Sequence, residues 1–302
     1  MSDKKDVEGQ RFKILEAIES GRHAKRDQVL MVRLDGHGFS KFTKGLKRPF
    51  DERMSNVMIE VTKFLVEETH ANHGYTQSDE ITLIWKLESP ELQEHYFGGR
   101  FQKVSSICAA KATKKFNQLL PTYLPEKAII GGEFDGRAMA FDSQSDAIDV
   151  LQWREKDAYK NSISMAAHTF FSFNSLQGIN GGDMIEMLKN VRVDFHAFPN
   201  YFKFGTHVKR FLVEEELTCT ELEKIPEKYR KAGKVKRKKV LAFSFPCKTK
   251  HLEFYVNSNQ TKYKDVIFAP FLQVHTTFTY DEIDTDWSVQ RIISKSIFEV
   301  TK

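Results

Sequence analysis

The stretch QVLMVRLDG, residues 28–36, predicts the first strand of a buried sheet, because residues 28–34 are almost all apolar. The strand is expected to end at Asp35-Gly36, since Asp-Gly is typical of turns. Residues 79–86, DEITLIWK, alternate apolar and polar side chains and predict another strand. Strands that follow one another along a chain usually lie side by side, so we expect these two strands to be neighbours in one sheet.

Two helices are predicted around the second strand. Apolar residues recur at helical spacing over residues 51–71, with Asp51 as a candidate N-cap and Gly74 just past the expected end. A second helix is expected from about Gly99 to Leu120, and Pro121 is expected to end it.

The next part of the chain continues the alternation of strands and helices. Residues 127–141 predict strand, turn and strand around Asp135-Gly136, and residues 145–171 predict a long helix. The order β, α, β, α, β indicates an α+β or α/β fold. Neither the glycine fingerprint of a dinucleotide-binding fold nor a P-loop motif occurs, which excludes those two nucleotide-binding classes.

The composition is that of a globular protein. The chain has 302 residues, of which 40% are hydrophobic and 29% charged, enough for one large domain or two ordinary ones. No apolar run approaches the roughly 20 residues that span a membrane, and the charged N-terminus does not resemble a secretory signal. The three cysteines show no C-x-x-C spacing, so we expect reduced thiols in a cytoplasmic protein.

Positive charge is concentrated in one segment. The net charge is only +5, but residues 228–239 carry eight Lys or Arg residues and no acid. Such a cluster is typical of a protein that binds a polyanion. A solvated loop without a partner is the alternative interpretation.

Two aspartates occupy similar places beside the predicted strands. Asp35 follows the first strand, and Asp79 opens the second. If the strands are neighbours, both carboxylates can face one cleft, and with the carbonyl of Gly36 they form an oxygen site suited to Mg²⁺. Two such ions can stabilise the attacking and leaving oxygens of a phosphoryl or nucleotidyl transfer. Taken alone, either aspartate is better explained as a turn or cap residue.

Residues suited to phosphate binding surround this pair. Arg33 shares a strand face with Asp35, and Ser78 precedes Asp79. Arg100 and Lys103 lie on one face of the second helix. Arginine binds phosphate through paired hydrogen bonds and lysine binds it as a point charge, so a metal-triphosphate site is predicted. A solvated helix face is the alternative for Arg100 and Lys103.

Five motifs in this order and spacing resemble the signature of the tRNA-histidine guanylyltransferase superfamily. They are Arg33-Leu34-Asp35-Gly36 with Phe39 and Phe42, Arg48-Pro49 with Asp51, the run from Gly74 to Glu80 (GYTQSDE), the run from Phe97 to Lys103 (FGGRFQK), and Phe134-Asp135-Gly136-Arg137.

The resemblance implies an α+β fold and an unusual reaction. The catalytic domain is expected to be palm-like, with a ferredoxin-like β-α-β core, an antiparallel or mixed sheet and helices on one face. Residues 1–140 would form this core, and residues 141–302 a helical and mixed C-terminal part with a smaller α/β extension, which can belong to the same compact unit. Members of the family add nucleotides to the 5′ end of tRNA in the 3′–5′ direction, using ATP to activate the end and GTP or another nucleoside triphosphate as the incoming nucleotide.

The resemblance also assigns roles to residues. Asp35, Gly36 and Asp79 would hold two Mg²⁺ ions, with Glu80 supporting catalysis. The nucleotide-binding residues would be Arg33, Arg48, Asp51, Ser78, Arg100 and Lys103. A homo-oligomer, dimer or tetramer, is implied as well.

One segment distinguishes two branches of the family. After Trp153-Arg154, the tRNA-histidine-specific enzymes carry His-Ile-Asn-Asn-Leu-Tyr-Asn, whereas this chain has YKNSISM at residues 159–165, and Asn161 alone matches. We therefore expect template-dependent repair of tRNA 5′ ends, in which base pairing selects the nucleotide. The addition of one G to histidine tRNA is the second hypothesis, a palm-domain nucleotide cyclase the third and a non-catalytic RNA-binding module the fourth.

Templated repair needs contacts with the RNA backbone rather than with particular bases. The candidate tRNA-contacting residues are Asn161, Lys203, Lys209, Arg210, Lys234, Lys236, Arg237 and Lys238.

Overall fold

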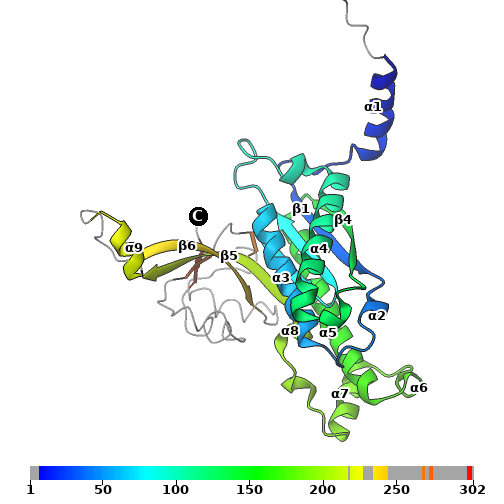
Figure 1. Cartoon of the computed structure of the whole chain (residues 1–302). Helices are drawn as coiled ribbons and strands as arrows, with labels where there is room; N and C mark the ends of the chain where they lie inside the picture. The colour runs from blue at the N-terminus through cyan, green and yellow to red at the C-terminus, as the bar shows by residue number, and fades with distance from the viewer. Residues whose placement is uncertain are drawn as a thin grey trace, which may run out of the picture.

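The first predicted strand lies second from one edge of an eight-stranded sheet. The structure, a computed structural model, describes residues 7–216, 218–226, 234–243, 267–268, 272–274 and 298–300 (Figure 1). Strand β1 (Val29–His37) pairs antiparallel with β3 (Glu80–Trp85) on one side and with β4 (Glu133–Phe141) on the other. The strands at residues 28–34 and 79–86 are therefore neighbours, as the sequence predicted.

Two helices cover one face of this sheet. Helix α3 (Glu52–Thr69) and helix α4 (Phe101–Tyr123) lie side by side over it (Figure 1). The even-numbered residues of β1, Leu30, Val32 and Leu34, are fully buried beneath them in the main core. Strand alternation therefore turns Arg33 and Asp35 toward the opposite face. Asp51 caps α3 as predicted, because its side chain accepts a hydrogen bond from the backbone N–H of Arg53.

The two Asp-Gly pairs lie inside strands, so the turns predicted there were wrong. Asp35 pairs with Asp135 in register, and β4 is one strand rather than the predicted strand, turn and strand. The glycines instead allow close packing. A Cβ on Gly136 would lie 2.7 Å from the carbonyl oxygen of Ser105 in α4, and one on Gly36 would lie 2.5 Å from the ring of Phe39.

Gly74 does not end a helix. Helix α3 ends at Thr69, and its C-cap His70 has the left-handed conformation with φ 54°. Gly74 lies in β2 (His73–Gln77), a strand that was not predicted. A Cβ on Gly74 would lie 2.6 Å from Val66, so glycine allows α3 to lie close to this strand. Helix α4 likewise passes the predicted stop at Pro121 and ends at Tyr123, where the N–H of Leu124 bonds to the carbonyl of Leu120.

The later part of the chain returns to the same sheet. Strand β5 (Thr206–Glu216) pairs antiparallel with β2, with Gly74 opposite Val208. The long helix predicted at 145–171 is confirmed as α5 (Gln144–Phe170), which contacts the sheet on the face away from α3 through Glu80 and His207. Strand β5 continues beyond the sheet in a ribbon with β6 (Lys234–Phe243), and α9 (Cys219–Lys224) lies at the far end (Figure 1).

These elements confirm the predicted α+β class, a helix-backed, mainly antiparallel sheet in which only the described pair β5 and β7 is parallel, with a smaller C-terminal extension. No helix of the described chain is long and apolar enough to cross a membrane. The other elements are α1 (Val7–Ser20), α2 (Phe39–Phe42), α6 (Phe173–Leu176), α7 (Gly181–Asn190), α8 (Asn200–Phe204), β7 (Leu272–Val274), β8 (Phe298–Val300) and three short 3-10 turns, Tyr96–Gly99, Pro125–Lys127 and Phe195–Ala197.

Candidate active site

Acidic residues lie level with one another on three adjacent strands. Asp35 of β1 is the register partner of Glu80 in β3 and of Asp135 in β4. Directly opposed residues in an antiparallel sheet point to the same face, so these three form a carboxylate row. Asp79 adjoins the row in the turn between β2 and β3. The pKa of Asp79 is raised, first because the group is buried and further by the charges of Asp35 and Glu80.

The two central carboxylates have almost no compensating partners. The Asp35 side chain forms no hydrogen bond or ion pair within the described chain, and Asp79 accepts one hydrogen bond, from Ser78 Oγ at 3.0 Å. Ser78 itself has the left-handed φ of 48° in the turn. An uncompensated carboxylate whose pKa is raised by burial and by neighbouring carboxylates fits a divalent cation, which removes the repulsion between the charges. Asp35, Asp79 and the carbonyl of Gly36 are the groups that could hold it.

The described residues contain no group of protein side chains that could bind a metal ion by themselves. Within the described ranges no three His, Cys, Asp or Glu side chains are grouped so that they could hold a metal ion. A cation at this site would therefore depend on two carboxylates, a backbone carbonyl, water and substrate oxygens, which is the usual environment of Mg²⁺.

Arginines lie next to the carboxylate row on the same face. Arg33 pairs in register with Arg137 of β4, each two residues from the aspartate of its own strand. Arg137 Nη2 lies 3.5 Å from Asp135 Oδ2, whereas Arg33 forms no ion pair among the described residues. A row of arginines beside a row of carboxylates suits a triphosphate bound together with a metal ion.

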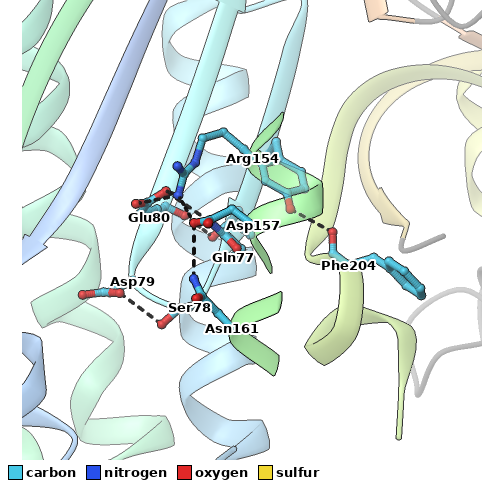
Figure 2. A network of polar contacts seen from close by, with 10 residues as sticks. Gln77, Ser78, Asp79, Glu80, Arg154, Asp157, Asn161 and Phe204 are labelled. Atoms are coloured by element: carbon cyan, nitrogen blue, oxygen red, sulfur yellow. Dashed lines mark hydrogen bonds and ion pairs between the residues drawn. The ribbon is translucent and has the colours of Figure 1, made fainter. Parts of the chain in front are cut away.

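Glu80 differs from the two aspartates because its charge is compensated. Arg154 Nη2, on α5, lies 2.8 Å from Glu80 Oε2 and 3.0 Å from Asp157 Oδ2, and the Arg154 side chain is 6% exposed. Asn161 Nδ2 donates to the same Asp157 oxygen at 3.3 Å, and Gln77 Nε2 donates to Glu80. Figure 2 shows this network beside Ser78 and Asp79. It connects α5 to the strand that begins next to Asp79.

A second buried polar group lies one residue further along α5. Glu155 Oε1 lies 2.7 Å from His207 Nε2, and His207 Nδ1 lies 2.9 Å from His73 Nε2. Burial, and then the nearby His207 and Lys209, hold the pKa of His73 well below its ordinary value. Because a carboxylate only accepts, His207 donates from Nε2 to Glu155, and its Nδ1 shares a hydrogen bond with His73 Nε2. We call Glu155, His207 and His73 the buried relay.

Comparison with known proteins identifies the family. The sequence model described as Thg1, tRNAHis guanylyltransferase, matches residues 12–143. Uncharacterized protein R259 of Acanthamoeba polyphaga mimivirus is 32% identical over 207 residues, 61% of this chain and 71% of that protein. A bacterial tRNA(His) guanylyltransferase (Thg1)-like protein, solved in complex with ATP, superposes with a TM-score of 0.63 at 30% identity, over 68% of this chain and 87% of that one. The chain belongs to the tRNA(His) guanylyltransferase family.

Further relatives agree with this assignment. The tRNA(His) guanylyltransferase of Schizosaccharomyces pombe is 29% identical over 199 residues, 65% of this chain and 73% of that enzyme. A Thg1-like protein solved with GTP shares the fold, with a TM-score of 0.65 over 87% of this chain and 100% of that one, at 24% identity. The family resemblance and the palm-like fold predicted from the sequence are confirmed. The chain is a tRNA(His) guanylyltransferase-like nucleotidyltransferase.

Several residues predicted to bind nucleotide form no hydrogen bond or ion pair with Asp35 or Asp79 in the described chain. Arg100 and Lys103 are exposed at the start of α4, where Arg100 Nε donates to the carbonyl of Phe97 and Lys103 Nζ lies 5.0 Å from the Phe97 ring centre. Neither forms a hydrogen bond or ion pair with Asp35 or Asp79 in the part of the chain that the structure describes. Asp51 is buried and bonded to Arg53, which lowers its pKa, and Arg48 is exposed in the loop before it.

Two lysines predicted to contact tRNA are buried instead. Lys203 Nζ donates to the carbonyl of His196 at 2.6 Å, and Lys209 Nζ donates to the carbonyls of Asn72 and Ile267 at 2.8 and 3.1 Å. Burial lowers the pKa of both. These ammonium groups bond to backbone carbonyls within the protein, whereas the sequence analysis placed both lysines among the candidate tRNA contacts. Arg210 also turns inward, where Nη2 donates to the carbonyl of His70.

The basic run lies only partly within the described chain. Residues 227–233 fall outside it, and the rest form β6. In register, Lys234 is opposite Glu216 and Lys236 opposite Glu214, so the strand partner of the run is acidic. Arg237 pairs with Glu221 of α9, and Lys238 is exposed.

The sequence did not indicate the roles of Arg137 and Arg154. The role of Arg137 could have been predicted from the two Asp-Gly pairs. Arg33 lies two residues before Asp35-Gly36, and Arg137 directly follows Asp135-Gly136. Arg154 lies between Leu151 and Ala158 on the buried stripe of α5, and a charge at such a position indicates a buried partner.

Proposed function

We propose that this protein is a Mg²⁺-dependent 3′–5′ polymerase that repairs the 5′ ends of tRNA by copying the opposite strand. The observation that carries the proposal is the pair of uncompensated carboxylates, Asp35 and Asp79, beside the unpaired Arg33. Family membership and neighbours solved with ATP and with GTP support the same reaction class.

Each part of the site has a role in this proposal. Asp35, Asp79 and the Gly36 carbonyl hold two Mg²⁺ ions, which when bound neutralise charge on the attacking and leaving oxygens. Arg33 and Arg137 bind the triphosphate, and Ser78 donates to a phosphate oxygen or to Asp79. Arg154 holds Glu80 in place, so Glu80 shapes the site rather than carrying an uncompensated charge. Arg48, Asp51, Arg100 and Lys103 complete the nucleotide-binding residues.

The chemistry follows from the direction of synthesis. An oxygen of the tRNA 5′-monophosphate attacks the α-phosphate of ATP, so that pyrophosphate leaves and the tRNA carries an adenylylated end. The 3′-hydroxyl of an incoming nucleoside triphosphate then attacks that end, a new phosphodiester bond forms, and AMP leaves. A 5′-triphosphate end reacts in the second step directly and releases pyrophosphate.

The packing of α5 favours templated repair over single-G addition. In the segment where tRNA-histidine-specific enzymes resemble one another, Tyr159 stacks on Phe204 with ring centres 5.2 Å apart, and Ser162 and Ile163 are buried. Asn161 is bonded to Asp157. Tyr159, Ser162 and Ile163 thus pack the helix, while Lys160, Asn161 and Met165 are exposed, and selection of the nucleotide by base pairing requires none of them.

A nucleotide-addition assay with Mg²⁺ and ATP tests the proposal. One RNA is histidine tRNA lacking its extra guanosine, and the other is a tRNA missing its first nucleotide, made in variants with a changed opposing base. Addition that follows the opposing base supports templated repair. Addition of G alone, to histidine tRNA alone, would establish the single-G alternative. If neither RNA is extended, with or without a 5′-triphosphate, the nucleotidyltransferase proposal is wrong. Asp79→Asn is the inactive control. It removes the charge proposed to bind Mg²⁺, and the Asn side chain can still accept the hydrogen bond from Ser78.

A further inference from the structure

Trp153 is an exposed tryptophan on α5, the helix that carries Arg154. It is 52% exposed, whereas Trp85, the other tryptophan that the structure describes, is 4% exposed in the main core. The guanidinium carbon of Arg154 lies 4.5 Å from the centre of the Trp153 ring. A single exposed apolar residue is ordinary, so what matters is the place of this ring relative to the candidate active site.

The rotation of the helix places Trp153 on the side of α5 nearer to the carboxylate row. Successive residues of an α-helix turn by about 100°. Arg154 reaches β3, and Glu155 reaches β5. The strand order β4-β1-β3-β2-β5 puts β1 and β5 on opposite sides of β3. Since the step from Arg154 to Glu155 leads toward β5, the step back to Trp153 leads toward β1, the strand that carries Asp35.

Two contacts connect the Trp153 ring to the carboxylate row. The ring packs on the Arg154 guanidinium, whose Nη2 lies 2.8 Å from Glu80 Oε2, and Glu80 is the register partner of Asp35. A nucleotide whose triphosphate binds beside Asp35 and Arg33 carries its base one ribose beyond the α-phosphate. An exposed aromatic ring two contacts from the row is therefore suited to meet that base.

We propose that Trp153 stacks on the base of the nucleoside triphosphate bound at the carboxylate row. This role rests on the proposed function, because it requires the triphosphate to bind beside Asp35 and Asp79. The contact with Arg154 holds the ring through a cation–π interaction.

A stacking ring also fits the proposed specificity. Stacking on an aromatic side chain tolerates any base, because every base has a π-face. It therefore suits an enzyme whose nucleotide is selected by pairing with a template. An enzyme restricted to G would instead need polar groups that match the edge of guanine.

Nucleotide binding without RNA tests this role in the full chain. Equilibrium dialysis with Mg²⁺ measures the affinity for GTP and for CTP, and inorganic tripolyphosphate serves as a competitor that has no base. Trp153→Leu keeps apolar cover over Arg154 but removes the ring, and it is expected to weaken binding of both nucleotides by about tenfold. Affinity for tripolyphosphate should stay unchanged. Trp153→Phe should restore most of the nucleotide affinity, because phenylalanine keeps a π-face.

A matched control and a spectroscopic signal accompany this measurement. Phe173→Leu changes another exposed aromatic residue, on α6, and is expected to leave nucleotide affinity unchanged. The chain has three tryptophans, so quenching of fluorescence by GTP that is present in the wild type and missing from Trp153→Phe reports on Trp153 itself.

Three outcomes would overturn the role of Trp153. Unchanged affinity for GTP and CTP in Trp153→Leu shows that the ring does not stack on the nucleotide, even if tRNA then binds more weakly. An equal loss of affinity for tripolyphosphate shows that Trp153 acts by supporting Arg154. A loss confined to GTP contradicts a base-tolerant contact. Failure of tRNA extension with this binding pattern intact would contradict the proposed reaction and leave the role of Trp153 standing. Wild-type protein that binds neither nucleotide nor tripolyphosphate would instead remove the triphosphate site on which both depend.

Discussion

Individual residues at the site are arranged at a cost in stability. Asp35 and Asp79 repel each other without a compensating cation among the described residues, whereas Glu80 has Arg154. Asp35 and Asp79 are thus available to bind a cation, whereas Glu80 is already paired with Arg154.

Replacing one of the two repelling aspartates should lower activity and raise the free energy of unfolding. We expect Asp35→Asn to abolish nucleotidyl transfer and, without divalent cations, to raise the free energy of unfolding by about 1 kcal/mol, because a repulsive charge is removed from a functional site. Urea unfolding with and without Mg²⁺ measures this. The control is Asp135→Asn, since Arg137 lies near that carboxylate and no gain is expected. A variant at Asp35 that is less stable than the wild type in the absence of metal contradicts the prediction.

The Arg154 ion pairs should contribute much more than an exposed pair. Arg154→Met leaves Glu80 and Asp157 without their partner, and we expect unfolding free energy to fall by about 2–4 kcal/mol, because breaking a buried pair leaves uncompensated charge. The matched control is Arg26→Met, which removes an exposed pair with Glu94 and is expected to cost less than about 1 kcal/mol. Equal losses for the two variants would show that the network in Figure 2 is not a stabilising one.

At the scale of elements, α5 is held on the sheet by polar contacts. Its buried side chains include the charged Arg154 and Glu155 between Leu151 and Ala158. Hydrogen bonds to Glu80 and His207 therefore fix the position of the helix along the sheet. Apolar contact is non-directional and would fix this position less specifically.

The buried relay predicts how stability depends on pH. Since the pKa of His73 lies well below 6.5 in the folded protein, the unfolded chain binds more protons as the pH falls below 6.5. Unfolding free energy should therefore be highest above pH 6.5 and should decrease below it, by up to about 1.4 kcal/mol per pH unit for this one group. Denaturant unfolding at several pH values measures the slope, and His73→Leu should make it shallower. An unchanged slope in His73→Leu would show that another group, such as His95, causes the dependence.

Sequence patterns predicted the elements whose periodicity was strong. Strand β1, helix α3 with its Asp51 cap, strand β3 and the long helix α5 all lie where they were expected. The adjacency of Asp35 and Asp79 also followed from strand order. Glycine misled the prediction, because Gly36, Gly74 and Gly136 serve close packing against a ring or a helix, which depends on residues distant in sequence.

The parts that could not be predicted depend on contacts across long sequence separations. The residues next to His73 in the sequence do not indicate that it contacts His207. Those next to Lys209 do not indicate that it donates to the carbonyl of Asn72. In a sequence, a lysine such as Lys203 or Lys209 resembles an RNA contact whether its side chain is buried or exposed. The positions of Arg100 and Lys103 likewise follow from where α4 starts on the sheet.

At the scale of the whole molecule, segments distant in sequence complete one sheet. Strand β5 covers the edge of β2, and the buried relay joins β2, β5 and α5. The residues around Asp79 therefore depend on the second half of the chain for their support.

We accordingly expect residues 1–140 alone not to fold stably. Without β5 and α5, the edge of β2 and the side chains of His73 and Tyr75 lose their cover. Circular dichroism and denaturant unfolding of this fragment should show no cooperative transition, in contrast to the full chain. A fragment that unfolds cooperatively with a stability close to that of the full chain would mean that the core is an independent domain.

The buried relay also constrains how this lineage can diverge. Loss of any one member leaves a buried polar atom without its partner, so single substitutions along the relay are selected against. Positions 73, 155 and 207 should consequently co-vary among relatives, exchanged together for apolar residues or retained together. An alignment of close relatives that shows Glu155 retained opposite an apolar residue at position 207 would argue against this linkage.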